Sequence, residues 1–198
     1  MRITVFGATG RTGRLLVGLA MERGHEVTAF LREGSDPTPV AEARVAFGDP
    51  CDPAAIAKAL AEARPEAVIS AIGPIAGVTE TEVSEAIGAI VAVMTDAGPS
   101  RLVIASNAVV FSDDELTGEF ADVGAEHRRN LALLRDSALD WTALAPELLR
   151  DDGATGSFVA KVEAPPPGPT IARADLALAL LDALDRPDWI GRAIGISS

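Results

Sequence analysis

Three glycines at regular spacing form the stretch whose chemistry is easiest to interpret. The sequence GATGRTG occupies residues 7–13, between the apolar run 3–6 and an apolar-periodic stretch that begins at Leu15. A strand that turns sharply into a helix needs glycine where a side chain would clash, and the new helix presents unpaired N–H groups to an anion. The pattern predicts a site for the pyrophosphate of a dinucleotide, and the alternative is a turn that only packs a helix on a sheet. The expected contacts are Gly7, Thr9, Gly10, Arg11, Thr12 and Gly13.

Arg32 is the first polar residue after the next apolar run, 19 positions beyond Gly13. In a dinucleotide fold an acid near this position selects the free 2′-hydroxyl of the adenosine ribose, and an arginine accommodates a 2′-phosphate. Arg11 and Arg14 are close in sequence, so we expect a basic corner that favours NADP over NAD. Glu33 weakens this interpretation, and each arginine alone could be a solvated surface charge.

Other polar or small residues follow later apolar runs. Asp49 comes after the run 45–47 and could accept a hydrogen bond from the adenine amino group, or could simply form a turn before Pro50. Gly73 lets the backbone approach the ribose or nicotinamide. Ser106 is the best-placed hydroxyl for a substrate carbonyl or the nicotinamide, and is our candidate catalytic residue, although a serine at such a place is often a local cap.

Strand-like and helix-like segments alternate along the chain and would bring these residues to one edge of a sheet. This alternation predicts an α/β fold, a doubly wound parallel sheet of the Rossmann type, and no polar linker divides residues 1–198 into separate domains. The final strand, 190–196, is expected at an edge of the sheet. The expected strands are 3–6, 27–31, 45–47, 67–74 including its exit turn, 102–105, 141–145, 157–162 and 190–196, and the main helices are 15–23, 53–62, 80–97, 123–137 and 173–184.

Two segments lie outside this regular alternation. Residues 146–170 are rich in glycine and proline, and we expect them to cover the substrate, with Pro146, Leu148 and Leu149 lining its pocket. In the helix 123–137, the trio from His127 to Arg129 reads as a solvated face, because the histidine has no assigned partner.

Composition narrows the classes of partner. The 198 residues carry a formal net charge of −12, which argues against nucleic acids and anionic membrane surfaces and leaves small molecules as the expected partners. The single cysteine, Cys51, has no neighbour at metal-ligand spacing and is interpreted as packing, so no metal is expected. With no membrane-spanning run and a strand directly after Met1, a cytoplasmic location is expected. Nothing in the sequence sets the oligomeric state.

The chain resembles the atypical short-chain dehydrogenase/reductase superfamily, and within it the group of NAD(P)H-flavin reductases, biliverdin reductase B and NmrA-like proteins. The resemblance rests on GATGRTG after the first strand, Arg32 after the second, Gly48-Asp49 after the third, and SALDWTALAP at residues 137–146. It covers nearly the whole length. It implies an NADP-binding Rossmann domain, with the cofactor contacted at the residues above, at Ala71, Ile72 and Gly73, and near Ser106.

The chain lacks the residues that usually carry catalysis in that superfamily. Catalytic members use a Tyr-x-x-x-Lys pair on the helix after strand five, but this sequence contains no tyrosine, and residues 123–137 contain no lysine. In the biliverdin reductase B pattern, a serine lies two residues beyond the position of Ser106, where this chain has Ala108. A histidine of that pattern falls at Leu148.

These features favour an NADPH-dependent reductase that transfers a hydride to a planar conjugated acceptor, such as a flavin or a quinone. A delocalised product anion can be protonated by water, so positioning would suffice. The alternative is an NmrA-like redox sensor that binds the dinucleotide without turnover.

Overall fold

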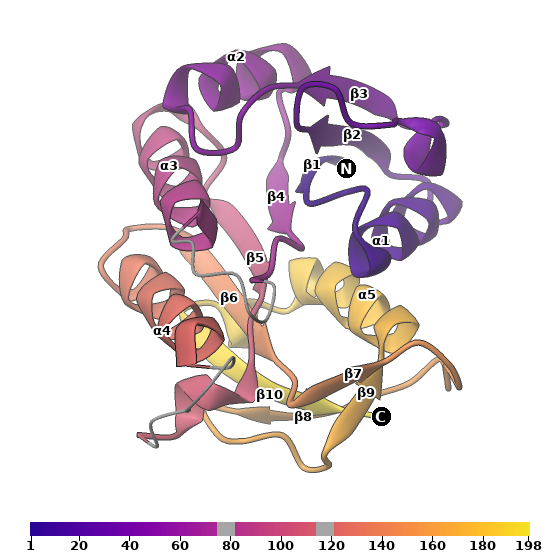
Figure 1. Cartoon of the computed structure of the whole chain (residues 1–198), viewed down its shortest axis with the longest axis vertical. Coiled ribbons are helices and arrows are strands. Elements are labelled where there is room, and N and C mark those ends of the chain that lie inside the picture. The colour runs from indigo at the N-terminus through magenta and orange to yellow at the C-terminus, as the bar shows by residue number, and fades with distance from the viewer. Residues whose placement is uncertain (75–81, 114–120) are drawn as a thin grey trace.

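The computed structural model describes residues 1–74, 82–113 and 121–198. Its main element is an eight-stranded sheet in the order β3-β2-β1-β4-β5-β6-β10-β8 (Figure 1), in which only β8 runs antiparallel to its neighbour. The strands are β1 (Arg2–Phe6), β2 (Glu26–Leu31), β3 (Arg44–Phe47), β4 (Ala67–Ser70), β5 (Arg101–Ala105), β6 (Asp140–Ala145), β8 (Val159–Val162) and β10 (Arg192–Ser197). A separate small ladder pairs β7 (Leu148–Arg150) with β9 (Thr170–Ala172).

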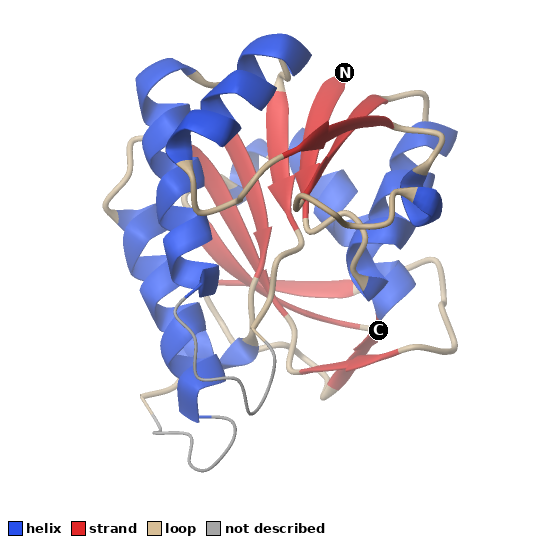
Figure 2. Cartoon of the chain, turned by 45° about the horizontal axis from the view of Figure 1, so that its top comes forward, coloured by secondary structure: helices blue, strands red, loops and turns tan. Residues whose placement is uncertain are grey.

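Helices cover both faces of the sheet (Figure 2). On one face, α1 (Arg11–Glu22) packs against α5 (Arg173–Asp182), and buries Leu16 with Leu180 in one apolar core. On the other face, α2 (Pro53–Ala63), α3 (Glu82–Ala97) and α4 (Ala121–Arg135) lie in a row and enclose a second core that includes Ile56, Ile90 and Leu134. Because both faces are covered, the central strands are continuous apolar runs. The predicted Rossmann-type fold is confirmed.

The expectation that the last strand forms an edge of the sheet is wrong. β10 lies between β6 and β8, with Ile194 opposite both Leu144 and Val162. The chain after β7 turns back and places β8 antiparallel beside β10, so β8 takes the edge position. Gly195 allows this close approach, because a Cβ there would lie 2.2 Å from the backbone oxygen of Ala164.

Candidate functional site

The glycine turn is a close backbone crossing between β1, α1 and the end of β4. Gly7 has a φ of +71°, and a Cβ on it would lie 2.8 Å from the carbonyl carbon of Ala71. A Cβ on Gly13 would lie 2.0 Å from the Gly7 oxygen, which accepts a hydrogen bond from the Gly10 N–H at 3.1 Å. Side chains at Gly7 and Gly13 are therefore excluded by the fold itself, because the backbone of β1, α1 and the end of β4 comes too close.

The first turn of α1 is free to bind an anion. Gly10 is the N-cap residue, no side chain in the described part of the chain caps the helix, and no acidic residue lies in its first turn. A helix of 12 residues with an uncapped start carries unpaired N–H groups and a partial positive charge. These residues fit the pyrophosphate of a dinucleotide.

The sheet brings the other predicted cofactor residues to the same edge. Gly7, Arg32, Gly48-Asp49, Ala71 and Ser106 follow the carboxyl ends of β1, β2, β3, β4 and β5, which are adjacent in the sheet. This edge is where open α/β sheets bind their ligands. A Cβ built on Gly73 meets no atom within 4 Å, so the backbone beyond β4 is accessible from one side.

A cavity of about 410 Å³ lies beside Arg32. The Arg32 Nη2 atom is 2.9 Å from Oε2 of Glu82, the first residue of α3. Asp49 also lines the cavity, and its Oδ1 accepts a hydrogen bond from the Cys51 N–H at 2.8 Å, which is the turn-forming geometry. The cavity has the position expected for the adenosine end of a dinucleotide.

The three arginines expected at one corner have different surroundings. Arg11 Nη1 lies 2.9 Å from Asp151 Oδ2, and the other oxygen of Asp151 accepts from Arg173 Nε at 2.7 Å. Arg14 is exposed, and neither it nor Arg11 lines the cavity at Arg32. The start of α1 is thus joined through Asp151 to the segment that follows β7 and to the start of α5.

Ser106 and the three expected substrate residues differ in exposure. Ser106 is buried, its N–H donates to the Leu144 oxygen at 2.7 Å, and its Oγ has no hydrogen-bond partner among the described residues. Leu148 and Leu149 are consecutive in a strand and point to opposite faces: Leu148 is exposed, and Leu149 packs against the core. The Pro146 oxygen accepts from the Ala108 N–H at 2.7 Å.

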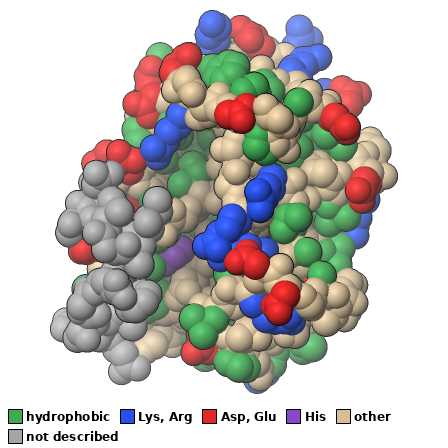
Figure 3. All heavy atoms as spheres, turned by 45° about the vertical axis from the view of Figure 1, so that its right-hand side comes forward, with side chains coloured by type: hydrophobic (Ala, Val, Ile, Leu, Met, Phe, Trp, Pro, Cys, Tyr) green, Lys and Arg blue, Asp and Glu red, His purple; other side chains and the backbone are tan. Residues whose placement is uncertain are grey.

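The expectation of a solvated face at His127 is wrong. His127 is only 6% exposed, its Nδ1 has no hydrogen-bond partner in the described ranges, and burial lowers its pKa to about 4. Asn130, Leu131 and Leu134 are also buried, at offsets of three, four and seven residues. That spacing is the helical signal that could have placed His127 on the buried face. Figure 3 shows one face of the molecule, on which a group of basic side chains lies with acidic side chains beside it.

Glu126, the neighbour of His127, joins two helices. Its carboxylate accepts hydrogen bonds from the Ser84 N–H at 2.8 Å and the Ser84 hydroxyl at 3.0 Å, and it also pairs with Arg129. Glu126 therefore satisfies a backbone N–H in the first turn of α3 from a position on α4. Only Arg129 of the predicted solvated trio is exposed.

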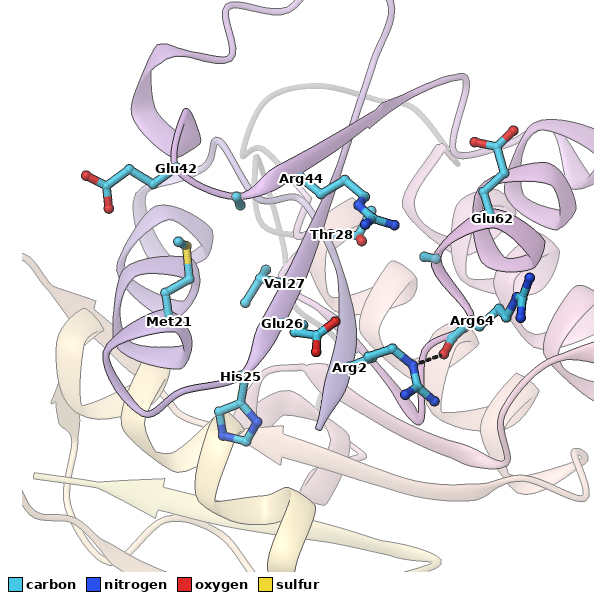
Figure 4. A pocket seen from close by; sticks show the side chains of 12 residues that line it. Arg2, Met21, His25, Glu26, Val27, Thr28, Glu42, Arg44, Glu62 and Arg64 are labelled. Atoms are coloured by element: carbon cyan, nitrogen blue, oxygen red, sulfur yellow. Dashed lines mark hydrogen bonds between the residues drawn. The ribbon is translucent and has the colours of Figure 1, made fainter.

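Another cavity, of about 600 Å³, lies at the opposite edge of the sheet (Figure 4). It surrounds the amino ends of β1, β2 and β3, and Arg2 donates from Nε to the Arg64 oxygen at 2.7 Å. Three arginines and three glutamates line it, so their formal charges cancel. It is remote from the glycine turn and contributes nothing to the dinucleotide site.

Two further properties of the described residues bear on other classes of function. None of the helices in the described ranges is long and apolar enough to cross a bilayer. No group of three or more His, Cys, Asp or Glu side chains there is arranged to hold a metal ion.

The chain matches one protein family and is similar to several known proteins over nearly its whole length. The profile of a family described as NAD(P)H-binding matches residues 7–187. The uncharacterized protein YwnB of Bacillus subtilis is 30% identical over 95% of this chain and 94% of its own length. A candidate exported protein from Burkholderia pseudomallei is 27% identical, with a TM-score of 0.81 over 99% of this chain and 98% of that one. A candidate NADH-flavin reductase from Streptococcus pneumoniae, SP1627, is 24% identical and has the same fold, with a TM-score of 0.83 over 100% and 99% of the two chains.

Proposed function

This chain belongs to the NAD(P)H-binding family, and from that premise we propose that it is an oxidoreductase that uses NADPH to reduce a planar conjugated acceptor of the flavin or quinone type. The observation that carries the proposal is the uncapped start of α1 above a glycine crossing that no side chain can fill. The cofactor would supply the hydride.

In this proposal the chain holds the cofactor along one edge of the sheet. The N–H groups at the start of α1 bind the pyrophosphate, and the cavity at Arg32 and Asp49 takes the adenosine end. The backbone from Ala71 to Gly73 then leads toward Ser106, whose hydroxyl has no hydrogen-bond partner among the described residues and can donate to the nicotinamide amide or to the acceptor. Arg32 is the group that favours a 2′-phosphate.

The sequence contains no tyrosine, so a Tyr-Lys proton relay is excluded. His127 is neutral near pH 7, because burial lowers its pKa to about 4. Reduction of a delocalised acceptor needs no strong acid from the protein, since water can protonate the product. The protein would act by positioning the reactants and excluding water, which can supply several kcal/mol or more.

Residues 146–170 are proposed to cover the acceptor. Asp151 links this segment to Arg11 and Arg173, and so to the starts of α1 and α5. Leu148 is exposed beside this link and provides an apolar surface for a planar ring. Leu149 anchors the strand in the core, and Pro146 is buried and would support Leu148 from beneath rather than touch the ring.

Binding and turnover test the proposal separately. NADPH and NADH are titrated by calorimetry, and oxidation of each is then followed with riboflavin, FMN, FAD and quinones. If the protein is a reductase, it should oxidise the nicotinamide cofactor when an acceptor is added. Tight binding with no oxidation by any acceptor would instead indicate a sensor that does not turn over its cofactor.

A further inference from the structure

The cavity beside Arg32 carries more negative than positive charge. Its lining combines one guanidinium with four carboxylates, those of Glu33, Asp49, Glu82 and Glu85. Among the described residues, Glu82 is the carboxylate that forms an ion pair with Arg32, at 2.9 Å. The two side chains are 62% and 48% exposed, so the pair can open without leaving a buried charge.

Cys51 lies in the same cavity, and its thiol responds to this charge. Its Sγ is 3.5 Å from the backbone oxygen of Glu82. Burial raises the pKa of the thiol, the carboxylates of Asp49, Glu85 and Glu82 raise it further, and Arg32 lowers it. The acidic groups therefore outweigh the guanidinium at this point of the cavity.

We infer that Glu82 is a specificity-determining residue that competes with the 2′-phosphate of NADP for the guanidinium of Arg32. The inference rests on the proposed function, which places the adenosine end in this cavity. A phosphate monoester carries nearly two negative charges near pH 7, and it would replace Glu82 as the partner of Arg32. NADH carries a 2′-hydroxyl and leaves the pair closed, so Glu82 limits the preference for NADPH.

The test compares Glu82→Gln with Glu33→Gln, which removes a carboxylate from the same cavity but none that pairs with Arg32 in the structure. Dissociation constants for NADPH and NADH are measured by calorimetry at low ionic strength. Glu82→Gln is expected to tighten NADPH binding roughly 3- to 10-fold, with NADH changed less than about twofold. Glu33→Gln is expected to change the NADPH dissociation constant only about twofold, because it alters the overall electrostatic potential of the cavity without freeing Arg32.

The same two substitutions are then made in an Arg32→Gln background. Without the guanidinium, Glu82→Gln should help NADPH no more than Glu33→Gln does. Equal effects of the two substitutions in the wild-type background overturn the inference, as does a loss of NADH binding in Glu82→Gln, which would make Glu82 an acceptor for the ribose. Because these readouts are binding constants, an absence of turnover contradicts only the proposed reaction, and failure of wild type to bind either cofactor contradicts both.

Cys51 provides a second readout, because it is the only cysteine in the sequence. Its alkylation by iodoacetamide should be faster in Glu82→Gln than in Glu33→Gln, and bound NADPH should slow it several-fold in both. Alkylation that NADPH leaves unchanged would show that the adenosine end lies elsewhere, and would overturn the inference. Melting curves recorded beside each titration show whether every variant is folded.

Discussion

At the scale of single residues, Gly10 both begins a helix and lies at the proposed pyrophosphate site. It is the N-cap of α1, and a Cβ there would lie 3.2 Å from the Gly7 oxygen, a tight but adjustable contact. We predict that Gly10→Asp leaves the fold as stable as wild type to within about 1 kcal/mol, because aspartate is a good N-cap. The same carboxylate should abolish measurable NADPH binding, because it occupies and repels the pyrophosphate site.

Gly10→Ala is the matched control, since it adds the Cβ without the charge. It should bind NADPH far better than Gly10→Asp does, as measured by calorimetry. NADPH binding by Gly10→Asp at wild-type affinity would place the pyrophosphate away from the start of α1.

His127 gives a second prediction at this scale. Its folded pKa of about 4 lies below the ordinary value of 6.5, so the unfolded chain binds more protons between these pH values. Stability from this group is complete above pH 6.5 and is lost as the pH falls toward 4, by about 3 kcal/mol in total. His127→Gln should therefore show a shallower loss of unfolding free energy over this range, measured by urea denaturation at several pH values.

His25→Gln provides the comparison. His25 is half-buried, and burial also lowers its pKa, so the change has the same sign and should be smaller. Equal slopes for wild type and His127→Gln would mean that the pKa of His127 is the same in the folded protein as in the unfolded chain.

At the scale of elements, the segment after β7 is held down by one buried carboxylate. Asp175 on α5 is 1% exposed and accepts hydrogen bonds from the Thr155 N–H at 3.1 Å and the Gly156 N–H at 2.9 Å. We predict that Asp175→Asn costs about 1–3 kcal/mol of stability and increases proteolytic cleavage near residues 153–157. Asp151→Asn changes an exposed carboxylate of the same region, and should cost less than about 1 kcal/mol by thermal denaturation.

The contribution of Asp175 to the stability of the fold should decrease at low pH. Burial raises the pKa of Asp175, but hydrogen bonds from Ser198, Thr155 and Gly156 outweigh it and leave the pKa below its usual value. The stabilisation is therefore present at neutral pH and is lost as the pH falls through the folded pKa. An Asp175→Asn protein as stable as wild type at pH 7 would contradict this role.

The helices could be predicted from the sequence, but the order of the strands and the long-range ion pairs could not. Apolar periodicity placed the main helices within about four residues of the ends that the structure describes, and the expected first residues of the helix 80–97 lie outside the described residues. The start of α2 at Pro53 is as expected, and the Asp52 side chain caps it by accepting from the Ala54 N–H. The placement of β10 was missed because local patterns do not encode which strands pair. The partners of Arg11 and Arg32 were missed for a similar reason, since Asp151 and Glu82 are 140 and 50 residues away in sequence.

At the scale of the whole molecule, a protein with a net charge of −12 must bind an anionic cofactor. Long-range repulsion slows the approach of NADPH, and salt screens it over a Debye length of about 8 Å at physiological ionic strength. We predict that the association rate constant rises with ionic strength, measured by stopped-flow fluorescence. Adenosine, which carries no phosphate, should show little such rise, and a falling rate constant for NADPH would mean that the local basic groups dominate its approach.

The strand that displaced β10 from the edge also has a consequence for aggregation. An edge strand offers free N–H and C=O groups to strands of other molecules, and β8 exposes Val159 and Val162. However, β8 is only four residues long and carries Lys161. It is soon followed by the three prolines 165–167, which have no N–H to donate. The same short strand that completes the sheet therefore stops it from growing into a fibril by the addition of further copies.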